Sequence, residues 1–539
     1  MIKSHLLPRF GVSSEISSNP TFNTEHKYFL DGNSMTCSKL YAIGYDKLAK
    51  LDLTEFSWLE VTRSRQMVEK IISDKKVTYG VNTGFGNFAT VVIPDEQLQQ
   101  LQVNLIVSHA TGVGECLTVE RARMLFALRL NVLAKGYSGI SPSLVRDLLD
   151  RFNLGLVSQI PVKGTVGASG DLAPLSHLIL GFLGQGNMWN PKTCQWEKAA
   201  DVLEAFKLKP LVLGAKEGLA LINGTQFIAS LGSEAIVRAR NVCRVADVIG
   251  ALTLEALRGS PHAFEPEIHQ ARPHRGQIKT AKILTALLTS SESHIQSSHE
   301  NCGKVQDSYT LRCMPQVHGI SKDTTKFVKD LLEVELNSAT DNPMVFYRSN
   351  KMLSCGNFHG EYPAKALDYL AIAIHELGSI SERRMSRLVN SSLSELPAFL
   401  VKNGGLNSGF MIAHVTSAAL VSENKTLCHP ASVDSLETSA AKEDHVSMGG
   451  WAARKALQVI ENVEYVLAIE LIAACQGFEF LRPLKSTEAL ESVYSKVREF
   501  VKPYDEDRYM KPDIDAAHHL IKSGELWACV KPFLASNLF

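Results

Sequence analysis

The segment Gly167-Ala168-Ser169-Gly170-Asp171 holds three small residues in an order that can turn the backbone into an electrophile. If the Gly170 amide nitrogen attacks the Ala168 carbonyl carbon and two waters leave, one taking the Ser169 hydroxyl, a 4-methylidene-imidazol-5-one ring (MIO) results. Gly170 has no Cβ to hinder this strained approach, and Ala168 adds little crowding. The triplet therefore predicts an electrophilic methylene where the sequence encodes a weak nucleophile.

The overall charge and hydropathy narrow the class of partner. The 539 residues include 56 basic and 56 acidic ones, so the formal net charge is zero and gives no general attraction to nucleic acid or anionic membranes. The longest apolar stretches, such as 370–374, are interrupted long before the roughly 18 residues that a membrane span needs. We therefore expect a small-molecule substrate, with no nucleic acid or membrane partner.

The N-terminal composition and the cysteines suggest a compartment. Residues 1–25 are polar and lack the apolar core of a secretory signal, so we expect a flexible tail and a cytoplasmic protein. The ten cysteines include no Cys-x-x-Cys pair, which favours reduced thiols over disulfides. We expect no metal site either. His375-Glu376 begins like the zinc-binding motif of metalloproteases, but Ser379 stands where the second histidine belongs.

The elements that must position the triplet are mostly helices. Apolar residues recur at spacings of three and four from 451 to 475, which predicts a long amphipathic helix. Similar patterns predict a helix from about Pro363 and helices over 118–134, 226–258 and 410–421. The middle of the chain therefore indicates a bundle of long helices around one core. Strand signals are short, at 77–81 and 344–347.

Several longer motifs in one order carry a resemblance to a known family. Residues 163–177 resemble the MIO signature of the aromatic amino acid ammonia-lyases, and most closely that of the histidase branch. The resemblance extends from about residue 29 to about residue 530. It is carried by further segments that look like histidases: Tyr79-Gly80-Val81-Asn82-Thr83-Gly84-Phe85-Gly86, Leu221-Ile222-Asn223-Gly224-Thr225-Gln226, Tyr309-Thr310-Leu311-Arg312-Cys313, Gly356-Asn357-Phe358-His359 and Glu443-Asp444-His445-Val446-Ser447-Met448.

The resemblance implies a mainly helical fold of the fumarase and aspartase superfamily type, with a smaller mixed N-terminal part that carries the MIO loop. We expect a flexible tail at 1–25, a MIO-loop domain at 26–225, a long-helix bundle at 226–480 and a helical cap at 481–539. The resemblance also implies a homotetramer with active sites shared between chains.

The implied reaction is the non-oxidative elimination of ammonia from L-histidine, which gives trans-urocanate and begins histidine degradation. MIO would form from Ala168, Ser169 and Gly170, so no external cofactor is expected. By resemblance, the methylene derived from Ser169 alkylates the substrate amine. Attack of the methylene on the imidazole ring is the alternative, and the amine route sacrifices less aromaticity.

Elimination also needs a base for the weakly acidic β-carbon, and the resemblance assigns that role to Tyr79. A tyrosine with the ordinary pKa near 10 is only about 0.1% ionised at pH 7, so the site must favour the phenolate. Arg312 is the best cation in the motif set for this task. Its guanidinium also matches a substrate carboxylate in a bidentate geometry that lysine cannot copy.

Four further residues receive supporting roles from the resemblance. Asn223 hydrogen-bonds around the MIO carbonyl and the substrate, Gln306 and Tyr309 organise the site, and Phe358 lies against the ring. Each of three also has a purely structural interpretation: Asn223 as a helix cap, Tyr309 as a buried phenol and Phe358 as core.

The choice of substrate depends on other positions. Ser108-His109 is the histidase pairing, where phenylalanine-specific relatives resemble Phe-Leu and tyrosine-specific ones His-Leu. Glu443 can accept an imidazole N–H, whereas a carboxylate beside a phenyl ring would be a buried and unpaired charge. Met411 can supply a compliant wall for the ring pocket.

Other functions remain open at this stage. A lyase for phenylalanine or tyrosine and an aminomutase would share the same motifs. A catalytically silent homologue would have lost Ser169, Tyr79 or Arg312, and all three are present.

Overall fold

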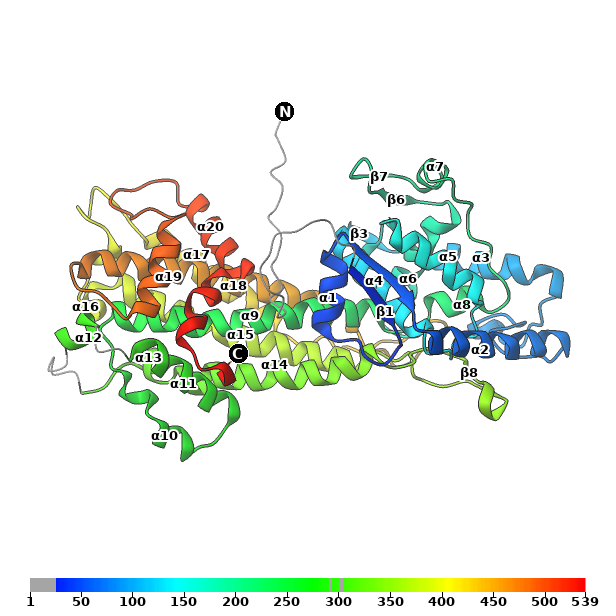
Figure 1. Ribbon diagram of the computed structural model, residues 1–539, viewed down its shortest axis with the longest axis horizontal. Coiled ribbons are helices and arrows are strands. Elements are labelled where there is room, and N and C mark those ends of the chain that lie inside the picture. The colour runs from blue at the N-terminus through cyan, green and yellow to red at the C-terminus, as the bar shows by residue number, and fades with distance from the viewer. Residues whose placement is uncertain (1–25, 290–292, 300–304, 539) are drawn as a thin grey trace.

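The computed structural model describes residues 26–289, 293–299 and 305–538, so the expected tail at 1–25 lies outside the described residues. Long helices run along the longest axis of the molecule, and a smaller part with helices and short strands lies beside one half of them (Figure 1). The expectation of a mainly helical fold is confirmed. None of the helices in these ranges has the length and apolar character to cross a bilayer.

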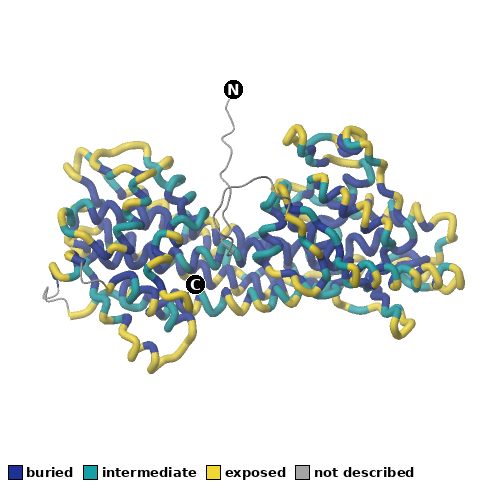
Figure 2. The backbone as a smooth tube through the Cα atoms, viewed as in Figure 1, coloured by how far each residue is buried: buried dark blue, intermediate teal, exposed yellow. Residues whose placement is uncertain are grey.

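Four long helices form the central bundle. They pack against one another in the pairs α15–α18, α9–α18, α14–α15 and α9–α14. Their shared faces consist mostly of buried aliphatic side chains, and each such side chain contributes about 1.5–3 kcal/mol when it leaves water. Figure 2 shows the resulting buried band along the whole axis. The helices are α9 (Gln226–Ala256), α14 (Met314–Leu336), α15 (Glu361–Val389) and α18 (Gly449–Leu481).

The sequence patterns located these helices well. The expected helix at 451–475 is the centre of α18, and the helix expected from about Pro363 is α15, which begins two residues earlier. The helix expected at 118–134 is α4 (Val119–Leu133), and Thr118 caps it by accepting a hydrogen bond from the Arg121 N–H. Capping by threonine satisfies one of the amide groups that every helix start leaves open.

The N-terminal part combines further helices with small sheets. β1 and β2 pair in parallel, whereas β3–β5, β4–β6, β6–β7 and β8–β9 are antiparallel. The strand expected at 344–347 is confirmed as β8. The strands are β1 (His26–Leu30), β2 (Ala49–Leu53), β3 (Val113–Cys116), β4 (Val157–Ser158), β5 (Pro161–Lys163), β6 (Asn187–Asn190), β7 (Gln195–Lys198), β8 (Met344–Phe346) and β9 (Lys351–Leu353). The helices of this part are α1 (Cys37–Tyr45), α2 (Glu55–Ser73), α3 (Leu98–His109), α4, α5 (Pro142–Asn153), α6 (Leu172–Leu180), α7 (Ala199–Ala205) and α8 (Glu217–Ile222).

Shorter helices surround the other end of the bundle. They are α10 (Pro266–Gln270), α11 (Arg275–Leu288), α12 (His294–Ser298), α13 (Tyr309–Arg312), α16 (Ser391–Ser394), α17 (Met411–Leu427), α19 (Glu488–Arg498), α20 (Lys511–Ser523) and α21 (Glu525–Val530). The α17 helix covers the segment expected at 410–421 and continues for six residues beyond it. In Figure 1, α13 and α17 therefore lie in the opposite half of the molecule from α6 and α8.

Candidate active site

The Ala168-Ser169-Gly170 triplet lies in a tight loop before α6, and the connection between α8 and α9 closes this loop. Gly170 forms a parallel bridge with Gly224, and the Asp171 N–H donates to the Gly224 carbonyl over 2.7 Å. Gly170 has a φ of +78°, and a Cβ there would come within 2.5 Å of the Gly224 oxygen. Only glycine fits this close approach to Gly224.

Asn223 lies directly opposite the triplet. Its Nδ2 donates to the Ser169 Oγ over 3.4 Å, and the residue is only 2% exposed. Its Oδ1 is buried and has no hydrogen-bond partner among the described residues. An unpaired buried acceptor is costly and uncommon, so this oxygen fits a donor that the protein itself does not supply. The neighbourhood of Ser169 therefore suits both the MIO ring and a ligand with an N–H group.

A buried arginine holds the turn that carries Asn223. Arg129 is 1% exposed, and its Nη1 donates to the Asn223 carbonyl and to the Gln226 Oε1, each over 2.7 Å. It also donates to the Ala220 carbonyl at the end of α8. Asp341, 4.0 Å away, supplies the opposite charge. Because a guanidinium can serve several acceptors in one plane, Arg129 fixes the geometry of the α8–α9 turn.

Asp171 ties the triplet to the start of α9. Its carboxylate accepts the Ile228 N–H over 3.0 Å and the Thr165 hydroxyl over 3.2 Å. Burial raises the pKa of Asp171 to about 7, although these hydrogen bonds favour the charged form. A carboxylate at a helix N-terminus also interacts favourably with the helix dipole. The loop is thus anchored on both sides, by Gly224 and by α9.

A second wall comes from the segments before α15 and α18. The Ser447 hydroxyl donates to the Gly167 carbonyl over 3.3 Å, and the Met448 N–H donates to the Val166 carbonyl over 2.9 Å. A Cβ on Gly360 would lie 2.8 Å from the Ser447 Oγ, so the two segments touch. Phe358, half-buried two residues earlier, is thereby brought to the same side as the triplet.

The residues expected to choose the substrate also approach one another. At the end of α3, Ser108 Oγ and His109 Nδ1 are hydrogen-bonded over 3.0 Å. Burial lowers the pKa of His109, and the negative charge of Glu443 opposes this effect. Since α3 packs against both α6 and α8, the pair Ser108-His109 borders the triplet's own elements.

Tyr79 is presented by a turn, so the strand expected at 77–81 is wrong. The Asn82 side chain accepts the Thr78 N–H over 2.8 Å and donates to the Lys76 carbonyl over 3.1 Å. These bonds occupy backbone groups that a strand would use for pairing. The half-buried Tyr79 ring meets Phe85 edge to face, with centroids 6.4 Å apart. The turn lies close to α8, because a Cβ on Gly80 would come within 2.9 Å of Leu219.

Gln306, Tyr309, Arg312 and Met411 do not meet the triplet within one chain. The first three lie at or next to α13, and Met411 begins α17, both in the half of the molecule away from α6 and α8 (Figure 1). Tyr309 is 71% exposed, so it is not a buried phenol of its own chain. The Arg312 guanidinium covers its ring at 4.7 Å, and Arg312 Nε donates to the Asp307 carbonyl over 3.0 Å. This pair presents a cation and a phenol at the surface.

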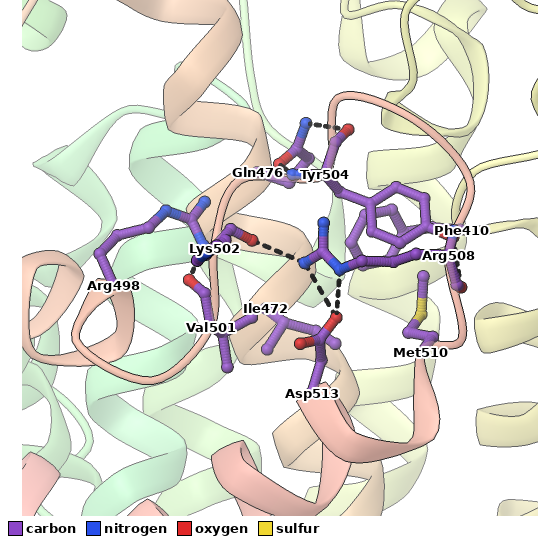
Figure 3. A pocket seen from close by; sticks show the side chains of 10 residues that line it. All are labelled: Phe410, Ile472, Gln476, Arg498, Val501, Lys502, Tyr504, Arg508, Met510 and Asp513. Carbon is purple, nitrogen blue, oxygen red and sulfur yellow. Dashed lines mark hydrogen bonds and ion pairs between the residues drawn. The ribbon is translucent and has the colours of Figure 1, made fainter.

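The start of α17 is held by a loop of the C-terminal part. The Asp507 carboxylate accepts the N–H groups of Ser408 and Gly409 over 2.7 and 2.9 Å. Figure 3 shows how Arg508 secures this loop through Asp513, and how Phe410 packs edge to face against Tyr504 beside a small cavity, with ring centroids 5.3 Å apart. Met411 therefore has a fixed position although 37% of its surface is exposed.

Sequence reasoning missed Arg129, Asp341 and Thr438. Arg129 occupies a position in the helical pattern 118–134 where nearly every neighbour is apolar, and a charge in such a pattern is a detectable signal. Thr438 donates to the Glu443 carboxylate over 3.0 Å, and no sequence pattern marks it.

The chain is similar in sequence and in fold to proteins of known function. The family described as aromatic amino acid lyase matches residues 35–499. Histidine ammonia-lyase of Mus musculus is 60% identical over 95% of this chain and 78% of its own length. The crystal structure of histidine ammonia-lyase from Trypanosoma cruzi is 53% identical, with a TM-score of 0.89 over 95% of this chain and 96% of that one. Tyrosine aminomutase from Streptomyces globisporus is 35% identical, with a TM-score of 0.88 over 95% of this chain and 99% of its own.

Proposed function

The chain belongs to the aromatic amino acid lyase family, and from that premise we propose that it is a histidine ammonia-lyase. It removes ammonia from L-histidine without oxidation and releases trans-urocanate. The observation that carries the proposal is the triplet before α6 together with the histidine-type pair Ser108-His109 on α3, which packs against α6 and α8. A substrate with an amine and an imidazole ring suits this site, because the amine can meet the electrophile and the imidazole can meet the histidine-type pair.

We propose that Ala168, Ser169 and Gly170 supply the ring, since Gly170 has a left-handed backbone and no described residue hydrogen-bonds the Asn223 Oδ1. Once formed, MIO supplies an electrophilic methylene that makes the substrate amine a better leaving group. Asn223 orients the substrate and the ring edge through its amide. Arg129 and Asp171 hold the two backbone segments in register, so that little reorganisation is needed during the reaction.

The remaining catalytic and binding roles belong to side chains outside the triplet. Tyr79 removes a proton from the substrate β-carbon, and Arg312 binds the carboxylate. Phe358 and Met411 confine the substrate ring. Gln306 and Tyr309 orient Arg312 and organise the site around the departing amine. These assignments need Arg312 to approach Ser169 from another chain, because one chain keeps them in opposite halves.

We therefore propose a homotetramer with shared sites. An exposed apolar surface on α14 and α15 supports association, since isolated monomers rarely leave such side chains in water. Its members are Ile320, Phe327, Val334, Tyr369 and Ile372, with exposed fractions between 42% and 69%. We also propose the cytoplasm as the compartment, in line with the free thiols of the nine described cysteines.

The purified chain should contain the ring, because cyclisation needs only residues that already lie together. We expect the intact mass to fall short of the sequence mass by two waters and a near-ultraviolet absorption band to appear. Both signals should vanish in Ser169→Ala. Full activity in a chain with the unmodified mass would contradict this proposal.

The function itself is tested by offering histidine, phenylalanine and tyrosine separately. We expect the conjugated acid to appear with histidine and only slowly with the others. A β-amino acid as the main product would favour an aminomutase instead, the activity of the Streptomyces globisporus protein named above.

Replacing Glu443 by glutamine should reduce histidine turnover by about 30-fold or more, because a desolvated charge-assisted bond to an imidazole N–H is worth roughly 2–5 kcal/mol. The amide keeps the shape and loses the charge. The measurement is kcat/KM for the three amino acids. Phenylalanine turnover should become appreciable only when Ser108-His109 is also changed to Phe-Leu, since a phenyl ring needs an apolar wall in the substrate pocket. Histidine turnover within about threefold of the unchanged enzyme would remove Glu443 from the imidazole site.

A further inference from the structure

The segment that carries Glu443 is a closed turn with an unusual backbone. Thr438 and Glu443 pair as an antiparallel bridge, with the Thr438 N–H donating to the Glu443 carbonyl over 2.9 Å and the reverse bond at 3.3 Å. Between them, Ser439, Ala440 and Ala441 have φ values of +52°, +51° and +65°. Three successive residues other than glycine thus occupy the left-handed region.

Such a backbone is costly for residues with a Cβ. Single left-handed residues of this kind are uncommon, and serine and alanine lack the amide or carboxylate that eases the conformation for asparagine or aspartate. Strained residues persist where the surroundings fix them, and they concentrate at functional sites. The strained backbone of the turn 438–443 therefore indicates that its shape positions a functional group.

The consequence of the shape is a hydrogen bond to a carboxylate. The turn brings the Thr438 hydroxyl to 3.0 Å from the Glu443 Oε2, where it donates. Across the described parts of the chain, Thr438 is the only side chain that hydrogen-bonds this carboxylate. One oxygen is thus occupied and oriented within the turn, and Oε1 is left to accept from a ligand. A hydroxyl donor to a charged acceptor makes a stronger bond than a neutral pair does.

We propose that Thr438 is a positioning residue for substrate recognition, whose hydroxyl fixes the Glu443 carboxylate so that Oε1 receives the imidazole N–H. This inference rests on the proposed function, in which Glu443 binds the imidazole. Thr438 touches no reacting atom. It acts by limiting the rotation of the carboxylate before the substrate arrives, which lowers the entropy lost on binding.

The test compares Thr438→Val, which keeps the shape and removes the donor, with Thr438→Ser, which keeps the donor. We expect kcat/KM for histidine to fall about tenfold in the valine variant, mainly through a higher KM, because the imidazole contact is present in ground state and transition state alike. The serine variant should stay within about twofold. Absorption of the MIO ring and the Tm should be unchanged in both.

Thr193→Val is the matched control, since Thr193 also donates to a glutamate, Glu197, over 2.5 Å, in the turn between β6 and β7. This variant should leave KM unchanged.

A double-mutant cycle with Glu443→Gln completes the design, because coupled residues give non-additive effects. If Thr438 acts through Glu443, Thr438→Val should change kcat/KM by less than about twofold in the glutamine background. An equal loss in both backgrounds would overturn the inference, as would a valine variant with unchanged KM. If Glu443→Gln alone leaves histidine turnover intact, the assignment of Glu443 in the proposed function fails first and the inference falls with it.

Discussion

Replacement of Ser169 by alanine is expected to lower histidine turnover by at least about a thousandfold, equivalent to about 4 kcal/mol of lost transition-state stabilisation. The physical reason is that alanine has no hydroxyl to eliminate, so the methylene cannot form. One hydroxyl in a half-buried loop contributes little to a core of this size, so the fold should survive. Initial rates, near-ultraviolet absorption and the Tm measured on the same preparation test this expectation.

Ser176→Ala provides the comparison for that experiment. Ser176 is fully buried on α6, seven residues from Ser169, and its Oγ lacks a hydrogen-bond partner in the described structure. Its replacement should leave both turnover and absorption near their original values. Substantial turnover in Ser169→Ala would show that the triplet is not the source of the electrophile.

Two inactive variants should restore activity when their chains are combined. Tyr79→Phe removes the expected base next to α8, and Arg312→Lys removes the bidentate carboxylate ligand at α13. Because the two positions lie in opposite halves of one chain, a shared site would draw them from different chains. With equal amounts and random assembly, about a quarter of the sites would then combine an intact Tyr79 with an intact Arg312.

The measurement is kcat per chain after the two variants are refolded together, beside each variant refolded alone. Mixed assembly must be verified, for instance by a mass tag on one variant. Absence of recovery in verified mixed oligomers would mean that each site is built from a single chain.

Sequence patterns predicted most of the bundle because long helices repeat their apolar spacing many times. The 33 residues of α18 and the 29 of α15 each contain several turns of this repeat, so single exceptions do not hide it. The strand predicted at 77–81 was wrong because its few residues were considered without the Asn82 side chain, which bonds to the backbone of Lys76 and Thr78.

Motifs supplied the residues of the candidate site, which stay predictions, but they did not supply the spatial arrangement of these residues. Motif order along the chain carries no information on which half of the fold each motif occupies, so the distance between Arg312 and Ser169 emerged only in three dimensions. The contact between Thr438 and Glu443 was not predicted for a similar reason, since a side-chain hydrogen bond across a left-handed turn has no periodic sequence pattern. Arg129 could have been noticed, as a charge within an apolar helix face must find acceptors.

The closure of the triplet loop has a bearing on how the enzyme matures. Asn223 and Gly224 contact the triplet, and Ser447 contacts the adjacent Gly167, all within one chain. Under the proposed sharing of sites, ring formation would draw on residues of one chain, whereas turnover would also require Arg312 from a second chain. In that arrangement, formation of the electrophile and onset of catalysis would be separable, and an isolated protomer would contain MIO without being active.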